Sequence, residues 1–245
     1  MTQTQPPTPP SVLIVMAHPD DGEFMCGATI ARWAREGYRI SYCLLTNGDC
    51  GTRDPAIKTR AQLAAIRKGE AQAAADALGL TSAVIFLDYV DSELQPTLEL
   101  RRDVTRVIRQ VRPDIVLTQD PSTFYHAQGY SNHPDHRYVG EVTLAAIMPS
   151  ASMRLIFPEL YDEEGLEPHD VRELYLTNTT HTDRWVEVTV EDLARQVAAL
   201  RAHASQIKSD PAEWVEADAK AEAASARKWG HDFTFAEGFK YFRLR

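Results

Sequence analysis

Short, continuously apolar runs alternate with longer amphipathic segments through the first half of the chain. Residues 12–17 are apolar and rich in branched side chains, which is typical of a strand buried on both faces of a parallel sheet. Residues 23–35 then carry apolar side chains at helical spacing and stop at Gly37, a common helix terminator. The repeated pattern predicts strands over 12–17, 40–46, 83–87 and 114–118, and helices over 23–35, 57–78 and 98–111.

Strands separated by helices of this length predict right-handed βαβ units and a mainly parallel sheet. We therefore expect an α/β fold with a Rossmann-like three-layer arrangement. The pattern in the last third is weaker. It favours helices over 134–148, 193–205 and 212–228, and strands over 154–157, 174–177 and 185–190.

The domain organisation is expected to be simple. The first ten residues are polar and rich in proline, which predicts a disordered leader over 1–10. Residues 11–245 contain neither an internal repeat nor a linker, so we expect one domain.

Composition and charge narrow the function classes. The chain has 245 residues, of which 44% are hydrophobic and 25% charged, as in ordinary globular proteins. Its 35 acidic residues outnumber 26 basic ones, so nucleic acid is not expected as a partner. No apolar run approaches the ~20 residues that span a bilayer, and no membrane association is expected.

The cysteines point to the cellular compartment. Cys26, Cys43 and Cys50 form an odd set without a CxxC pair, which argues against a disulfide framework. The beginning of the chain lacks the apolar stretch of a signal peptide. We therefore expect reduced thiols and a cytoplasmic protein.

A first group of polar residues follows the first predicted strand. His18, Asp20, Asp21 and Glu23 lie where open α/β sheets place their ligand crevices. His18 and Asp21 are three residues apart and could converge on one cation, which leaves Asp20 free. Taken alone, the group is better explained by helix capping through Asp20 or Asp21, with His18 as a hydrogen-bonded loop residue.

A second group makes capping a poor explanation. His133, Asp135 and His136 follow the strand predicted over 114–118 by way of a long polar loop, and they open another helix. The first and fourth strands of a doubly wound sheet are neighbours, so both groups would face one crevice. Three nitrogen or oxygen ligands with an open position are typical of a catalytic zinc site rather than a structural one.

The two motifs resemble a known family. Ala-His-Pro-Asp-Asp-Gly-Glu at 17–23 and His-Pro-Asp-His-Arg at 133–137 are similar to motifs of the LmbE/PIG-L family of zinc-dependent N-acetylglucosaminyl deacetylases. Further similar segments lie at 47–49, 66–70, 86–91 and 202–206. The resemblance implies a metal site at the carboxyl ends of the first and fourth strands.

The same resemblance assigns roles to the residues of the motifs. It implies that His18, Asp21 and His136 bind the metal and that Asp20 is the general base. A carboxylate beside the metal, but not bound to it, can accept a proton from zinc-bound water, whose pKa is roughly 7. The resulting hydroxide would attack the amide carbonyl of the substrate.

Other positions carry assisting roles by resemblance. His133 would stabilise the oxyanion or protonate the leaving amine, and Asp135 would orient an imidazole or raise its pKa. Tyr130, three residues before His133, is a candidate to approach the oxyanion.

Several assignments have structural alternatives. Arg67 and Asp91 match positions that hold the sugar, but Arg67 could instead pair with a carboxylate such as Glu70, and Asp91 could start a turn. Glu23 is expected to be a first-turn helix carboxylate or a partner of a ligand rather than a ligand itself. His203 is expected to serve in packing or hydrogen bonding.

The implied function is hydrolysis of an acetyl group from an N-acetylglucosamine-type conjugate, with Zn²⁺ or another divalent transition metal as cofactor. A small-molecule amino-sugar conjugate is the expected partner, and homo-oligomerisation is left open. Alternatives are an amidase that releases a larger acyl group and a non-catalytic sugar- or metal-binding protein. The chain lacks GxGxxG and GxxxxGK[ST] motifs, which argues against dinucleotide and phosphate binding.

Overall fold

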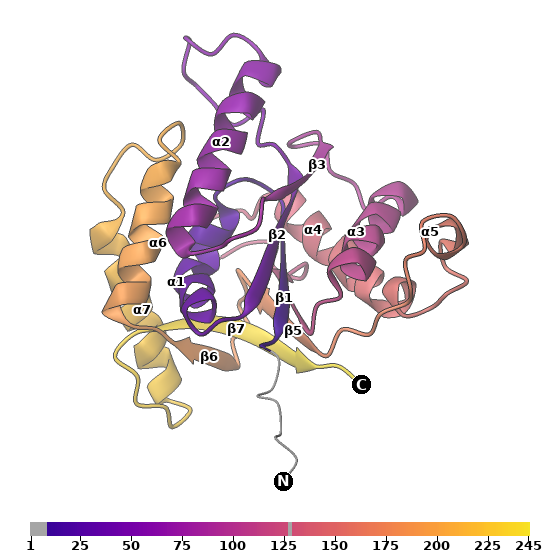
Figure 1. Ribbon diagram of the computed structural model, residues 1–245. Coiled ribbons are helices and arrows are strands. Elements are labelled where there is room, and N and C mark those ends of the chain that lie inside the picture. The colour runs from indigo at the N-terminus through magenta and orange to yellow at the C-terminus, as the bar shows by residue number, and fades with distance from the viewer. Residues whose placement is uncertain (1–8, 127–128) are drawn as a thin grey trace.

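A seven-stranded sheet with helices on both faces forms the centre of the protein (Figure 1). The structure is a computed structural model that describes residues 9–126 and 129–245. The strand order is β3-β2-β1-β4-β5-β7-β6. The first five strands in this order, from β3 to β5, run parallel, and β7 is antiparallel to both of its neighbours, β5 and β6. The strands are β1 (Ser11–Met16), β2 (Arg39–Thr46), β3 (Ile85–Tyr89), β4 (Ile115–Gln119), β5 (Glu173–Thr177), β6 (Arg184–Glu187) and β7 (Ala236–Arg243).

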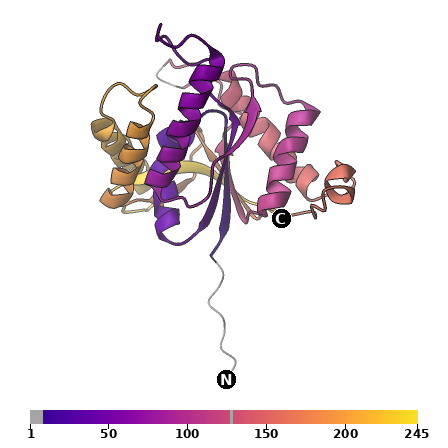
Figure 2. The same ribbon diagram turned by 45° about the horizontal axis from the view of Figure 1, so that its top comes forward.

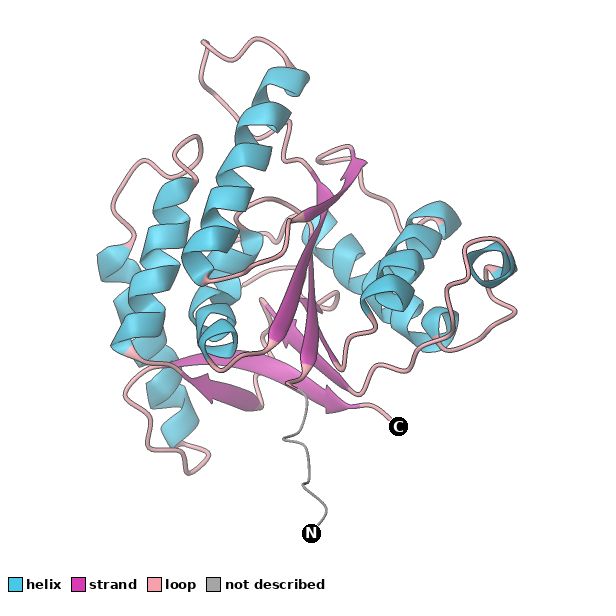
Figure 3. Cartoon of the chain, viewed as in Figure 1, coloured by secondary structure: helices cyan, strands magenta, loops and turns pink. Residues whose placement is uncertain are grey.

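Helices cover the two faces of this sheet and complete the three layers. The helices α1, α2, α6 and α7 lie on one side, and α3, α4 and α5 lie on the other (Figures 1 and 2). The helices are α1 (Asp21–Arg35), α2 (Arg60–Leu78), α3 (Leu98–Val111), α4 (Pro134–Ala145), the π-helix η1 (Ala146–Ala151), α5 (Pro158–Asp162), α6 (Val190–Ala202) and α7 (Ala212–Arg227). The expected α/β fold with a mainly parallel sheet is confirmed (Figure 3).

The central strand β1 supplies side chains to both halves of the core. Val12, Ile14 and Met16 pack on the side of α1 and α2, whereas Leu13 and Val15 pack on the side of α3 and α4. All five are fully buried. Successive side chains of a strand point to opposite faces, so a strand between two helical layers has to be apolar at every position.

Most predicted elements are present, with boundaries that differ by at most three residues. The strand expected over 154–157 is wrong, because these residues form turns. The guanidinium of Arg109 donates to main-chain carbonyls of Ser150, Ala151 and Met153, and Phe157 has a left-handed φ of 53° before α5 begins. The left-handed φ of Phe157 is incompatible with a regular strand, and Nη2 of Arg109 also donates to the carbonyl of Ile156 within the segment at 3.3 Å.

The strand β7 was not predicted from the sequence. It lies between β5 and β6 and closes the antiparallel end of the sheet. Of the leader expected over 1–10, residues 1–8 lie outside the described residues. The single domain expected over 11–245 stays a prediction, although all seven strands belong to one sheet.

Two further observations bear on the sequence-based expectations. All three cysteines are free; Cys26 and Cys43 are buried and Cys50 is exposed. Among the described residues, no helix is both long and apolar enough to cross a membrane.

Close approach of α4 to the end of β4 depends on Gly140. A Cβ atom at this position would lie 2.2 Å from the carbonyl oxygen of Gln119 and 2.9 Å from the nitrogen of Pro121. Both atoms belong to the main chain, so they cannot rotate away. This glycine therefore lets α4, which begins at the second His-Asp motif, pack directly on the strand end.

We predict that Gly140→Ala lowers the free energy of unfolding by about 1–3 kcal/mol, the usual cost of overpacking. Gly69→Ala is the matched control. Gly69 lies within α2, and a Cβ atom added there would meet no neighbouring side chain within 4 Å, so alanine should stabilise the helix by about 0.5–1 kcal/mol. Urea denaturation measures both, and equal stabilities of the two variants would contradict this view of the α4–β4 contact.

Candidate metal centre and active site

The three predicted metal ligands converge at the carboxyl ends of β1 and β4. Donor atoms of His18, Asp21 and His136 all lie within 4.8 Å of one another. The two oxygens of Asp21 face different imidazoles: Oδ2 is 3.4 Å from Nδ1 of His18, and Oδ1 is 3.1 Å from Nε2 of His136. All three residues are buried. The motifs therefore meet as the parallel strand order requires.

Local backbone geometry separates the two adjacent aspartates. Asp20 has a left-handed φ of 100°, which is strained for a residue with a side chain and is frequent at functional sites. The main-chain N–H of His18 donates to Oδ2 of Asp21 at 2.8 Å. Among the described residues, the Asp20 side chain makes no capping hydrogen bond to α1. Capping therefore does not explain Asp20.

His136 is oriented by an asparagine network. Its Nδ1 lies 2.9 Å from Oδ1 of Asn132, and that oxygen also accepts a hydrogen bond from Nδ2 of Asn178 at 3.0 Å. Asn132 in turn donates through Nδ2 to the carbonyl of Thr123. Since Oδ1 can only accept, Nδ1 of His136 carries a proton, and Nε2 of the same ring faces Asp21.

Sequence reasoning missed both asparagines. Asn132 directly precedes the second His-Asp motif, so its position next to a ligand was a usable signal. Asn178 follows β5, more than forty residues further along the chain, and nothing in the sequence pattern marked it.

The far side of His18 contacts two more carboxylates. Its Nε2 is 3.2 Å from Oδ2 of Asp135 and 3.3 Å from Oδ1 of Asp91. Burial acts to lower the pKa of His18, but Asp21, Asp135 and Asp91 raise it well above its usual value. This imidazole is therefore held between carboxylates on both of its nitrogens.

His133 caps α4 through its side chain. Its Nδ1 accepts the main-chain N–H of Asp135 at 3.2 Å, so the neutral ring carries its proton on Nε2. Burial and the neighbouring His18 lower the pKa of His133. The His133 ring centroid lies 4.8 Å from that of His18, and the side chain is 33% exposed. The structure thus places an accessible N–H donor beside the predicted ligands.

Arg67 makes its ion pair with Asp20 rather than with Glu70. Its Nη2 donates to Oδ2 of Asp20 at 3.0 Å, and its Nη1 donates to the carbonyl of Gly48 at 3.0 Å. Glu70 instead accepts two hydrogen bonds from Ser205. Burial raises the pKa of Asp20 to about 7, although Arg67 acts to lower it.

A small open cavity of about 200 Å³ adjoins these groups. Asp91 on its wall accepts hydrogen bonds from the Cys50 main chain and the Ser92 hydroxyl, each at 3.0 Å. Tyr130 does not line this cavity; it is 58% exposed, and its ring lies beside His126. The lining residues are His18, Asp20, Cys50, Gly51, Arg67, Asp91, Ser92 and His133.

Glu23 and His203 form a buried layer behind the cluster. Both are fully buried, with Nε2 of His203 at 3.8 Å from Oε2 of Glu23. The same oxygen accepts the hydroxyl of Tyr42 at 3.1 Å. Glu23 therefore contacts Tyr42 and His203 and is not one of the converging ligand groups.

The residues present fit a divalent cation. Two other groups, His18 with Asp91 and His133, and Asp49 with Cys50 and Asp91, are also compact, but each includes a less buried member. The His18–Asp21–His136 group is buried throughout and supplies two nitrogens and a carboxylate, a usual ligand set for catalytic zinc. Asp135 adds a buried Oδ1 without a hydrogen-bond partner among the described residues.

Comparison with known proteins places the chain among deacetylases. A family model described as "PIG-L: GlcNAc-PI de-N-acetylase" matches residues 13–147. A diacetylchitobiose deacetylase of Thermococcus kodakarensis is 32% identical over 94% of this chain and 82% of its own length. A 1D-myo-inositol 2-acetamido-2-deoxy-alpha-D-glucopyranoside deacetylase of Actinosynnema mirum is 28% identical, with 81% of each chain covered.

The fold comparison agrees. The solved structure of N,N'-diacetylchitobiose deacetylase from Pyrococcus horikoshii matches with a TM-score of 0.82 and 28% sequence identity, and the match covers 95% of this chain and 84% of that one. The family match includes most of β1, all of β4 and both His-Asp motifs, which confirms the resemblance seen in the sequence. The chain belongs to the PIG-L family.

Proposed function

We propose that this protein is a zinc-dependent hydrolase that removes the acetyl group from an N-acetylglucosamine-type sugar conjugate. The observation that carries the proposal is the convergence of His18, Asp21 and His136 beside a separate carboxylate, Asp20. A structural metal site needs no spare base next to it, whereas hydrolysis does. The deacetylases of amino sugars among the relatives support the same reaction.

The residues divide between holding the metal and moving protons. His18, Asp21 and His136 would hold Zn²⁺ through two nitrogens and one carboxylate. Bound zinc lowers the pKa of water to roughly 7 and polarises a carbonyl. Asp20 accepts the proton of the attacking water, and its salt bridge to Arg67 fixes the carboxylate while that transfer takes place.

His133 serves the other end of the reaction. Its Nδ1 is occupied as an acceptor, so the Nε2–H donates to the developing oxyanion or toward the leaving amine. Asp135 positions two imidazoles at once: its main-chain N–H binds His133, and its carboxylate lies against His18.

The amino sugar occupies the 200 Å³ cavity beside the cluster, where Asp91 and Arg67 lie on the wall. Asp91 supplies an acceptor for sugar hydroxyls. Arg67 has both terminal nitrogens engaged by the protein, so it acts on the sugar mainly through its charge and through Asp20. A cytoplasmic location accords with the three free thiols.

Loss of one ligand tests the metal centre. We predict that purified wild type contains about one zinc-like ion per chain and that His136→Ala contains little, because two ligands rarely hold catalytic zinc. His181→Ala, at an exposed position outside the cluster, is the control and should keep its metal. Elemental analysis gives the ratio, and an unchanged ratio in His136→Ala would overturn this ligand assignment.

Replacing the base tests the reaction. Asp20→Asn keeps an oxygen for Arg67 but cannot accept a proton, so acetate release from N-acetylglucosamine conjugates should fall about 10²–10⁴-fold while metal content is retained. Asp232→Asn, on the exposed surface, is the matched control. Near wild-type turnover by Asp20→Asn would remove Asp20 from the mechanism, and no acetate release by the wild type would contradict the proposed activity.

The asparagine network should set metal affinity. Asn132→Ala leaves the Nδ1–H of His136 without its acceptor, and loss of such a partner typically weakens metal binding about 10–100-fold. Asn178→Ala removes only the hydrogen bond to Asn132, so the expected loss is smaller. Competition with a zinc chelator measures both affinities; an Asn132→Ala affinity equal to wild type would show that the network does not orient the ligand.

A further inference from the structure

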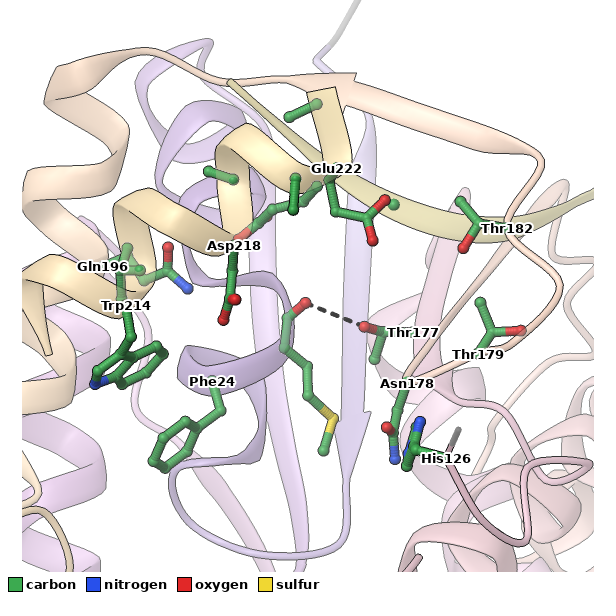
Figure 4. A pocket seen from close by; sticks show the side chains of 17 residues that line it. Phe24, His126, Thr177, Asn178, Thr179, Thr182, Gln196, Trp214, Asp218 and Glu222 are labelled. Atoms are coloured by element: carbon green, nitrogen blue, oxygen red, sulfur yellow. Dashed lines mark hydrogen bonds between the residues drawn. The ribbon is translucent and has the colours of Figure 1, made fainter. Parts of the chain in front are cut away.

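A second, larger cavity of about 480 Å³ lies outside the active site (Figure 4). It is bounded by the first turn of α1, by α7, and by the segment that follows β5. None of its lining residues also lines the cavity that holds Asp20 and His133. The proposed deacetylation leaves it without a role.

One wall of the second cavity is aromatic. The rings of Phe24 and Trp214 stack with centroids 5.4 Å apart and an interplanar angle of 14°, and Phe24 remains 43% exposed. Figure 4 shows the two rings side by side at one end of the cavity. Such faces accept the C–H side of a sugar ring, and the indole face attracts an ammonium group.

Three of the four ionisable side chains along the wall are acidic, and the fourth is His126. Asp218, Glu222 and Glu237 line the cavity, and no Lys or Arg is among its described lining residues. Glu222 already accepts the indole N–H of Trp185, and Glu237 accepts two main-chain N–H groups of α1.

Asp218 differs from the other two acids. No described residue donates a hydrogen bond to its carboxylate, and burial raises the pKa of this group above its usual value. It projects from α7 toward the cavity between Trp214 and Glu222 (Figure 4). Asp218 is exposed, so its carboxylate is open to a cationic ligand from the side of the cavity.

The opposite rim joins the cavity to the metal centre. Thr182 and Asn178 lie there with polar side chains (Figure 4). Asn178 donates to Asn132, which contacts His136, so two hydrogen-bonded contacts separate this rim from a predicted ligand. A hydroxylated molecule that contacts Asn178 in the second cavity would therefore be linked to the predicted ligand His136 through Asn132.

We propose that the second cavity binds an amino-sugar unit in its deacetylated form, with the ammonium group at Asp218, the ring against Trp214, and hydroxyls at the Thr182 rim. The combination selects this ligand class: an aromatic wall suits a sugar ring, and a wall with three carboxylates and neither Lys nor Arg among its described residues suits an amine rather than a phosphate or carboxylate. The inference goes beyond the proposed function, since it concerns binding and not turnover.

Nuclear magnetic resonance of the tryptophan indole N–H groups tests the location. Methyl glucosaminide titrated into nitrogen-15-labelled protein should shift the Trp214 signal, assigned with Trp214→Phe, and should leave the signal of Trp229, 64% exposed and outside the cavity, unchanged. The inference would be overturned if the Trp214 signal did not shift, as expected when the amine binds only in the catalytic cavity. It would also be overturned if the Trp229 signal shifted as much as the Trp214 signal.

Asp218→Asn tests the charge. Its affinity for methyl glucosaminide should fall about tenfold, whereas its affinity for the uncharged methyl glucoside should not change. Glu216→Gln, on the same helix and outside the cavity, should bind both as wild type does. An equal loss for both sugars, or no loss for either, would contradict the role of Asp218. Wild type that binds methyl glucosaminide in the second cavity but releases no acetate would contradict only the proposed function. Wild type that releases acetate but does not bind methyl glucosaminide in this cavity would contradict only this inference.

Discussion

The carboxylate of Asp21, buried between the imidazoles of His18 and His136, is the interaction on which the rest of the site depends. Burial alone would raise the pKa of this carboxyl, yet the two histidines hold it well below its usual range. An ionised group in such surroundings has to be compensated by positive charge. The proposed Zn²⁺ would supply such charge at this point.

The parallel sheet makes that arrangement possible. β1 and β4 pair directly, with Ile14 opposite Leu117, so motifs more than one hundred residues apart leave the sheet at adjacent strand ends. Gly140 then lets α4 pack against the end of β4, and Asn132 turns His136 toward Asp21. The strained backbone of Asp20 directs a second carboxylate to Arg67 instead of to the helix start. Precision at the centre thus comes from the strand ends and from hydrogen bonds around the ligands.

The sequence predicted the elements in which local pattern and tertiary environment agree. Strands such as β1 are apolar because both faces are covered, and the His-Asp motifs have fixed spacing at strand ends. It failed at residues 154–157, where the carbonyl of Ile156 accepts a long-range hydrogen bond from Arg109 and Phe157 has a left-handed φ, and at β7, whose pairing with β5 and β6 depends on distant partners. Asn178 and the Asp20–Arg67 salt bridge depend on the folded arrangement in the same way.

The central claim is that one cation binds among His18, Asp21 and His136 while Asp20 stays unbound. Crystals of the zinc-loaded protein, with anomalous diffraction recorded on both sides of the zinc absorption edge, test it most directly. The account predicts one strong peak within about 2.0–2.2 Å of one atom from each of the three residues, with Asp20 beyond ligand distance. A peak ligated by Asp91 and His133, or one that includes Asp20, would contradict it.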